Sequence, residues 1–267
     1  MQEGVGQVPQ ERGLRSGADV LVATPGRLLD LANQGHVRFD DVSVFVLDEA
    51  DRMLDYGFFP DVKRIVNQLP PVRQSLLFSA TLPPEIVDLA QRMTRDPARI
   101  EVAPPATTAE KVEQYLIHVA NNEKRFVVAD LVRKRDVTRA LVFTRTKHQA
   151  NRLTKHLVEA GVQAMAIHGN KSQSARQAAL GSFKSGQTPV LVATDIAARG
   201  IDVDGISHVI NVDIPDVPET YVHRIGRTAR AGATGIALTL CDREDLPNLR
   251  GVERLIGKKI EVLDGRF

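Results

Sequence analysis

The chain has 267 residues, a formal net charge of +2, and 43% hydrophobic and 25% charged residues. These values are typical of globular proteins and exclude a globally disordered or fibrous chain, while the length favours about two domains. The longest apolar runs, Val42–Leu47 and Val190–Ala193, are far shorter than the roughly 18 residues that cross a bilayer, and the first residues lack the pattern of a secretion signal. Because Cys241 is the single cysteine, no intramolecular disulfide can form, and we expect a cytoplasmic protein that does not bind membranes.

The front part of the chain alternates between short apolar runs rich in β-branched residues and amphipathic stretches of helical length. This alternation is typical of parallel strands joined by crossover helices and predicts an α/β fold. The first ten residues show neither the pattern of a strand nor that of a helix. The predicted strands are Asp19–Ala23, Val42–Leu47, Gln74–Phe78 and Arg99–Val102, and the predicted helices are Gly26–Gln34, Pro60–Gln68 and Pro83–Met93.

A second series of the same kind follows a segment with two prolines and no period, which we interpret as a linker over residues 104–111. The predicted domains are therefore residues 1–103 and 112–267. Residues 1–105 carry 11 basic and 15 acidic side chains, net −4, and the rest of the chain carries 24 and 18, net +6. The second series predicts strands at residues 112–119, 139–143, 164–168, 189–193, 208–212 and 235–240, and helices at residues 123–133, 147–160, 172–185 and 220–229.

The run D-E-A-D, Asp48–Asp51, follows apolar residues 44–47, so its acids lie at the carboxyl end of a predicted strand. Open α/β sheets bind ligands at this edge. An acid there can hold the water shell of a nucleotide-bound Mg²⁺ ion, and a neighbouring acid can orient an attacking water. The alternative interpretation is that these acids cap the helix after the strand.

Two further runs follow predicted strands in the front part. Ser79-Ala80-Thr81 offers two hydroxyl groups to a carboxylate or to the backbone, and a helix cap is the alternative. Thr24-Pro25-Gly26-Arg27 combines a hydroxyl, the free N–H groups of a helix start and a guanidinium, which together suit a phosphate. An ordinary helix start explains the same residues equally well.

The most distinctive run of the back part is H-R-I-G-R-T-A-R at residues 223–230. Arg224, Arg227 and Arg230 recur every three residues, so we expect them along one side of a helix, without an acid at i+4 to neutralise them. Arginine forks bind phosphates bidentately, and an arginine that reaches a transferred phosphate from another domain stabilises the transition state. A solvated charged face is the alternative.

Together these motifs resemble those of the DEAD-box RNA helicases of superfamily 2, from about Gly13 to about Asp264. The resemblance implies two RecA-like parallel-sheet domains in tandem, of which the first is incomplete at its N-terminus. It also implies ATP and Mg²⁺ as cofactors, single-stranded or duplex RNA as the partner, and a monomeric state. The overall sequence is similar to that of the bacterial RhlE-type subgroup. The sequence does not identify a protein partner.

The resemblance further implies roles for single residues. Asp48 would hold Mg²⁺ through water, Glu49 would be the general base, and Arg227 and Arg230 would be arginine fingers. Asp51 would link to the Ser79-Ala80-Thr81 motif, which couples nucleotide state to strand separation. Nucleotide contacts would come from Asp48, Asp51, Ser79, Thr81, Asp202, His223 and Arg224. Contacts to one RNA strand would come from Thr24, Pro25, Gly26, Arg27, Phe143, Thr144, Arg145, Gly169, Gln173, Arg176 and Thr194.

One motif of the family is not found. The phosphate-binding pattern G-x-x-x-x-G-K-[ST] does not occur in the 267 residues, and the nearest segment, Gly251–Lys259, has the wrong spacing. We therefore expect a helicase core that lacks the front of its first domain and hydrolyses little ATP alone. The alternative is a non-catalytic RNA-binding remnant, or a regulator of an intact helicase.

Overall fold

The computed structural model describes residues 6–55, 57–101, 112–198, 201, 203–229 and 234–263. The chain divides into two compact units, Met1–Glu101 and Val102–Phe267. The predicted linker, residues 104–111, lies outside the described residues. Within the described ranges, no helix is long and apolar enough to cross a membrane.

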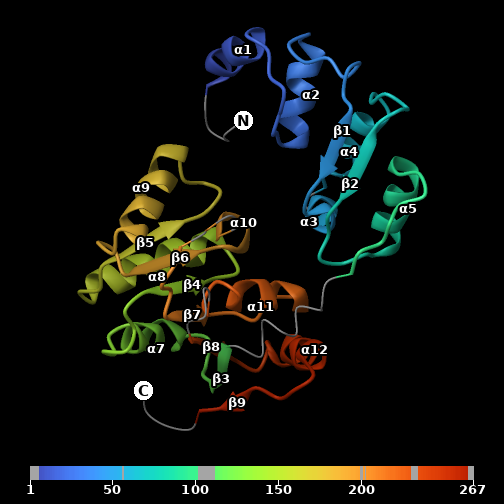
Figure 1. Cartoon of the computed structure of the whole chain (residues 1–267). Helices are drawn as coiled ribbons and strands as arrows, with labels where there is room; N and C mark the ends of the chain where they lie inside the picture. The colour runs from blue at the N-terminus through green and yellow to red at the C-terminus, as the bar shows by residue number, and fades with distance from the viewer. Residues whose placement is uncertain are drawn as a thin grey trace. The chain divides into compact units, whose positions relative to one another are not determined.

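The first unit combines helices with one pair of parallel strands (Figure 1). Its elements are α1 (Gln7–Arg15), α2 (Pro25–Asn33), β1 (Val44–Leu47), α3 (Ala50–Asp55), α4 (Phe59–Val66), β2 (Gln74–Leu77) and α5 (Pro84–Met93). Side chains of a strand alternate between its two faces. Phe45 and Leu47 accordingly pack against buried residues of the helices, whereas Val44 and Val46 are 51% and 52% exposed. The helices therefore cover one face of this strand pair.

Two predicted strands of the first unit are wrong. Residues of Asp19–Ala23 and the described residues 99–101 of Arg99–Val102 form no strand. A strand needs a neighbour to satisfy its backbone groups, and neither segment pairs with a strand in the described part; Val20 is 82% exposed and Ile100 is 85% exposed. Helices α1 and α3 were not predicted, and α1 buries no residue, so it lacks an apolar stripe that would reveal it.

The second unit contains a seven-stranded parallel sheet with the order β5-β6-β4-β7-β8-β3-β9. Its strands are β3 (Val112–His118), β4 (Ala140–Phe143), β5 (Ala164–Ile167), β6 (Val190–Ala193), β7 (His208–Asn211), β8 (Gly235–Cys241) and β9 (Glu261–Val262). Its helices are α7 (Lys124–Leu131), α8 (Lys147–Glu159), α9 (Gln173–Lys184), α10 (Asp195–Ala198), α11 (Pro218–Ile225) and α12 (Leu246–Ile256).

Helices cover both faces of this sheet. On β4, Ala140 and Val142 join one buried cluster with residues of α7 and α8, and Leu141 and Phe143 join another with residues of α9 and α10. A third cluster packs α11 and α12 against β3 and β8. Burial on both faces explains why the strands are continuously apolar rather than alternating. Because all strands of this sheet are parallel, their carboxyl ends lie at one edge of the sheet.

The predicted elements of the second unit are all present, most with bounds shifted by one or two residues, while α10, α12 and β9 were not predicted. The expected helix over residues 220–229 is α11, which begins at Pro218 and ends at Ile225. Beyond Gly226 the chain turns, and the Thr228 hydroxyl donates to the Ile206 carbonyl. Gly235 permits this close approach, since a Cβ at that position would overlap with Thr228. The helix therefore ends before Arg227.

Candidate functional site

The first unit brings two of the sequence motifs into direct contact at the carboxyl ends of β1 and β2. The backbone N–H of Asp51 donates to Ser79 Oγ at 3.1 Å, and the Ser79 hydroxyl donates to the Thr81 carbonyl at 2.6 Å. The backbone N–H and the hydroxyl of Thr81 both donate to Asp51 Oδ2 at 3.0 Å. The expected link between Asp51 and Ser79-Ala80-Thr81 is thus present, and it closes around a carboxylate whose residue is only 8% exposed.

Asp48 and Glu49 lie before this link, at the turn from β1 into α3. Asp48 is exposed, and its Oδ1 accepts the backbone N–H of Glu49 at 2.9 Å. Glu49 has φ 52°, a left-handed conformation that is unfavourable for a residue with a side chain and is often found at functional sites. Its carboxylate lies 2.6 Å from Arg52 Nη1. The turn therefore presents two acids to solvent, one of them oriented by a guanidinium.

The donor set at this turn suits a magnesium ion bound to a nucleotide. Mg²⁺ in such sites keeps several waters and takes one or two carboxylates together with phosphate oxygens. Asp48 offers an exposed carboxylate with one oxygen outside the contact to Glu49. The residues present therefore fit Mg²⁺ held through water by Asp48.

The Thr24-Pro25-Gly26-Arg27 segment forms the start of α2. Thr24 is the residue before the helix and makes no side-chain cap, while Pro25 is buried at the first helical position. Arg27 lies 3.8 Å from Asp30, an exposed pair of the kind that contributes little stability. The segment thus keeps an exposed hydroxyl and a partly exposed guanidinium at a helix start.

In the second unit, the candidate RNA contacts follow three neighbouring strands. Phe143, Thr144 and Arg145 end β4, Thr194 follows β6, and Gly169 follows β5. Since β5, β6 and β4 are adjacent and parallel, these residues share one stretch of the sheet edge. Gln173 begins α9, the helix after β5, and its Oε1 accepts from Arg176 Nη1 at 3.4 Å. The structure therefore gathers these candidates, although Phe143 and Thr144 are 2% and 0% exposed.

The expectation of an unneutralised arginine row on one helix is wrong. Arg224 is 3% exposed, and its Nε and Nη2 donate to both carboxylate oxygens of Asp195 at 2.5 and 2.7 Å. Its Nη1 donates to the Asp213 carbonyl at 2.7 Å, and the guanidinium stacks 5.1 Å from the Phe143 ring centre. Arg224 therefore joins α11 to the start of α10. Sequence spacing could not reveal this partner, because Asp195 lies 29 residues away.

Of the remaining arginines of that run, the structure describes Arg227, which lies outside α11. Arg227 follows the helix end, is partly exposed, and donates from Nη1 to the Ile201 carbonyl at 3.1 Å. His223 lies on α11 and is partly exposed. Arg230 and Asp202 lie outside the described residues, so their assignments as arginine finger and ribose contact stay predictions.

A buried ion cluster that was not predicted lies near the carboxyl end of β4. Lys124 is 2% exposed, and its Nζ lies 2.7 Å from Asp245, 3.1 Å from Asp242 and 3.7 Å from Asp213. Burial opposes the charge on Lys124, but the hydrogen bonds and negative charges of its three partners outweigh burial and raise its pKa above the ordinary value. The cluster also holds the candidate RNA contact Arg145.

The contacts of Arg145 join this cluster to the strand edge. Its backbone N–H donates to Asp213 Oδ2 at 3.0 Å, and its Nη2 donates to Asp245 Oδ1 and to the Ile214 carbonyl, each at 3.1 Å. The Arg145 side chain is nonetheless 45% exposed. One face of this guanidinium is therefore fixed by protein partners, and the rest stays open to solvent.

Two buried histidines should make the stability of the second unit sensitive to acid. Burial lowers the pKa of His208, against the opposing charge of Asp136, and burial together with nearby cationic side chains lowers the pKa of His168. Because the unfolded chain takes up these protons first, stability should fall as the pH drops below the ordinary histidine pKa of about 6.5. Urea unfolding should show a lower unfolding free energy at pH 5.5 than at pH 7.5. His208→Gln should reduce this difference, and the same change at exposed His118 should not.

The comparisons with known proteins cover both units. Residues 2–89 match the DEAD/DEAH box helicase family, and residues 123–232 match the helicase conserved C-terminal domain. A solved DEAD box protein from Methanococcus jannaschii is 39% identical with a TM-score of 0.56, and the match covers 99% of this chain and 71% of that chain. The chain belongs to the DEAD-box RNA helicase family. The predicted α/β fold of tandem RecA-like domains is confirmed by this likeness to solved DEAD-box helicases.

Curated relatives refine the family placement. ATP-dependent RNA helicase RhlB of Pseudomonas putida is 46% identical over 245 residues, which are 91% of this chain and 62% of that protein. CshA of Geobacillus kaustophilus is 42% identical over 94% of this chain and 54% of that protein. The chain thus spans little more than half the length of these relatives. Their names are RhlB and CshA, so the RhlE-type placement finds no support.

One solved relative carries ligands. Saccharomyces cerevisiae Dbp5 bound to RNA and ADP BeF3 has a TM-score of 0.82 and is 30% identical, and the match covers 92% of this chain and 66% of that chain. Both ligand classes expected from the sequence, a nucleotide and RNA, are thus bound by a solved DEAD-box protein.

Proposed function

We propose that this chain forms the core of an ATP-dependent RNA helicase that locally unwinds or remodels RNA duplexes. The observation that carries the proposal is the hydrogen-bonded link from Asp51 to Ser79 and Thr81, which joins the acidic turn after β1 to the segment after β2. A change of charge or of bound water at the acidic turn would thereby be transmitted to the segment after β2. We further propose that the chain works as a cytoplasmic monomer.

The acidic turn would supply a metal ligand and a general base for hydrolysis of a phosphoanhydride. Mg²⁺ bound there supplies charge neutralisation at the phosphates. Asp48 would hold its water shell, and Glu49, oriented by Arg52, would accept a proton from the attacking water. Arg227 and Arg230 would stabilise charge on the transferred phosphate, and Asp202 and His223 would complete the nucleotide contacts. Arg224, predicted from the sequence as a further nucleotide contact, would instead position α11 through its bidentate bond to Asp195.

The sheet edge of the second unit suits one RNA strand. Hydroxyls, backbone N–H groups and arginines at the ends of β4, β5 and β6 offer contacts to phosphates and sugars, which are the contacts that position a nucleic acid without reading its sequence. Thr24–Arg27 would add contacts from the first unit. RNA bound by the solved relative Dbp5 supports this choice of ligand class.

A non-catalytic RNA-binding role is the second candidate. It is favoured by one observation, the lack of G-x-x-x-x-G-K-[ST] in the 267 residues. Positioning and electrostatics provide nearly all of the catalysis in phosphoryl transfer, so hydrolysis needs a cradle for the phosphates. We therefore expect ATP hydrolysis by this chain alone to be negligible.

RNA-stimulated phosphate release distinguishes the two candidates. It should be at background for the 267-residue chain and strong for a chain extended at its N-terminus with the corresponding segment of the RhlB relative. Glu49→Gln in the extended chain should abolish the stimulated rate, because the proposed base is lost. An extended chain that binds RNA but releases no phosphate would favour the non-catalytic role. Strong release by the unextended chain would refute the expected inactivity.

A further inference from the structure

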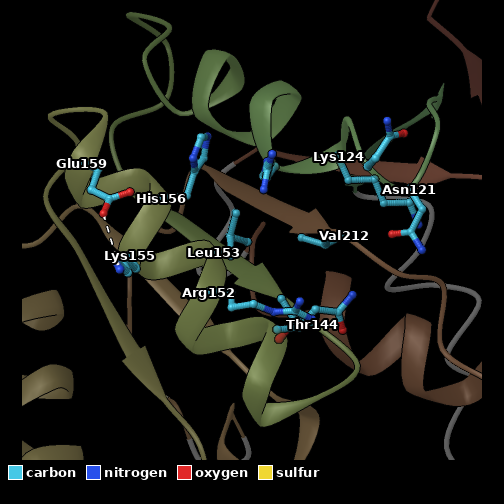
Figure 2. A pocket seen from close by; sticks show the side chains of 12 residues that line it. Asn121, Lys124, Thr144, Arg152, Leu153, Lys155, His156, Glu159 and Val212 are labelled. Carbon is cyan, nitrogen blue, oxygen red and sulfur yellow. Dashed lines mark ion pairs between the residues drawn. The ribbon is translucent and has the colours of Figure 1, made fainter.

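A groove lies between α7 and α8 in the second unit. Apart from Lys124 and Thr144, its lining residues belong neither to the motifs nor to the ion cluster described above. Its cavity volume is about 690 Å³. Thr144, Leu153 and Val212 line it, and residues Asn121 and Arg152 reach in from the segment before α7 and from α8 (Figure 2).

Four of the twelve residues that line this groove are lysine or arginine. Lys124 and Arg125 come from α7, and Arg152 and Lys155 come from α8; Lys124 is already paired with buried acids. Glu159 is the one acid among the lining residues, and it lies 3.8 Å from Lys155, as the dashed line in Figure 2 marks. Within the described part of the chain, neither Arg125 nor Arg152 forms an ion pair with a carboxylate. Two exposed guanidiniums on facing helices favour an anion that bridges them.

An aromatic side chain stands beside these cations. Phe126 is 49% exposed, and its ring lies 5.1 Å from the His156 ring in an edge-to-face contact. The Arg125 guanidinium lies 4.6 Å from the centre of the same ring. Exposed aromatic rings beside cations are the arrangement on which single-stranded nucleic acids stack their bases. Phe126 does not line the groove itself, so the groove offers phosphate contacts and the exposed ring beside it offers a base contact.

The groove also begins next to the carboxyl ends of the strands. Thr144, which lines it, is fully buried, but it directly precedes Arg145, a candidate RNA contact whose side chain is 45% exposed. We propose that the groove binds the phosphates and a base of single-stranded RNA where the strand extends beyond the segment held at the ends of β4, β5 and β6. This inference rests on the proposed RNA-binding function and adds Arg125, Arg152 and Phe126 to it.

A comparison of two RNA lengths tests the proposal. Binding of fluorescent oligouridines of six and twenty nucleotides to the 267-residue chain would be followed by anisotropy between about 50 and 200 mM salt. Arg125→Ala/Arg152→Ala should weaken binding of the longer RNA about tenfold and lower its salt slope by roughly 1.4, since each phosphate contact of a single strand contributes about 0.7. Binding of the shorter RNA should change less than about twofold.

Arg250→Ala/Arg254→Ala is the matched control, because it removes two exposed arginines from α12 of the same unit. An equal loss in both double variants, or no loss in Arg125→Ala/Arg152→Ala, would overturn the proposal and leave the strand-edge site intact. Phe126→Ala should weaken binding of the longer RNA without changing the salt slope of that binding. A changed slope would contradict the stacking role. Failure of the unmodified chain to bind either RNA would instead refute the proposed function, and this inference with it.

Discussion

Replacement of Lys124 by methionine is expected to lower the unfolding free energy of the second unit by about 3–5 kcal/mol. The side chain is 2% exposed and lies within 4 Å of three carboxylates, so its removal leaves acids buried without their cation. Burial raises the pKa of Asp242, but Lys124 outweighs that effect and holds the pKa below its ordinary value. Urea unfolding at pH 7.5, followed by circular dichroism, measures the loss.

Two variants make this expectation specific. Lys155→Met removes an exposed lysine whose nearest acid, Glu159, lies 3.8 Å away, and it should change stability little. Lys124→Met/Asp245→Asn should recover part of the loss, because it removes one of the unpaired charges. The Lys124 cluster has a defined pH window. Its contribution should be lost as the pH falls through the lowered pKa of Asp242 and as it rises through the raised pKa of Lys124. A Lys124→Met chain as stable as the original would show that the cluster is not stabilising.

The parts of the site that could be predicted all depend on strand ends. Continuous apolar runs identify buried parallel strands, and parallel strands place their carboxyl ends at one edge. That reasoning placed the acids of Asp48–Asp51 and the hydroxyls of Ser79 and Thr81 at strand ends, because these polar residues follow their strands directly in the sequence. The specific link from Asp51 to Ser79 and Thr81, and the role of Thr144 and Thr194, came from the resemblance to the DEAD-box family.

The parts that could not be predicted depend on contacts between residues far apart in the chain. Lys124 follows a polar segment, and no residue near it in the sequence indicates that it will pair with three aspartates more than 80 residues away. The prediction of an arginine row on one helix was wrong for a similar reason. Three-residue spacing places Arg224 and Arg227 on one side of a helix only if the helix continues. Helix α11 ends at Ile225 instead, and the chain beyond it turns to the contact between Thr228 and Ile206. Strand predictions failed where an apolar run, such as Val20–Ala23, found no neighbour to pair with in the described part.

These buried contacts also separate the residues that shape the site from those free to act in it. Arg224, Asp195 and Asp213 join α11, α10 and the end of β7 into one hydrogen-bonded unit. Arg145 is held by the neighbouring Lys124 cluster but keeps an exposed side. A substitution at either kind of position would reduce activity, so activity alone does not distinguish them. Stability measured beside activity does.

Arg227→Ala should therefore lower the kcat of RNA-stimulated ATP hydrolysis by about three orders of magnitude in the N-terminally extended chain, with a smaller effect on ATP binding, if it acts as an arginine finger. Its unfolding midpoint should stay near that of the parent, because the side chain is partly exposed and follows the end of α11. Arg224→Ala is the contrasting variant: it leaves Asp195 without its bidentate partner and should lower the midpoint clearly. Turnover near the parental rate in Arg227→Ala would instead give this residue a structural or RNA-binding role. A loss of kcat accompanied by an equal loss of stability in both variants would show that the whole run after His223 is structural.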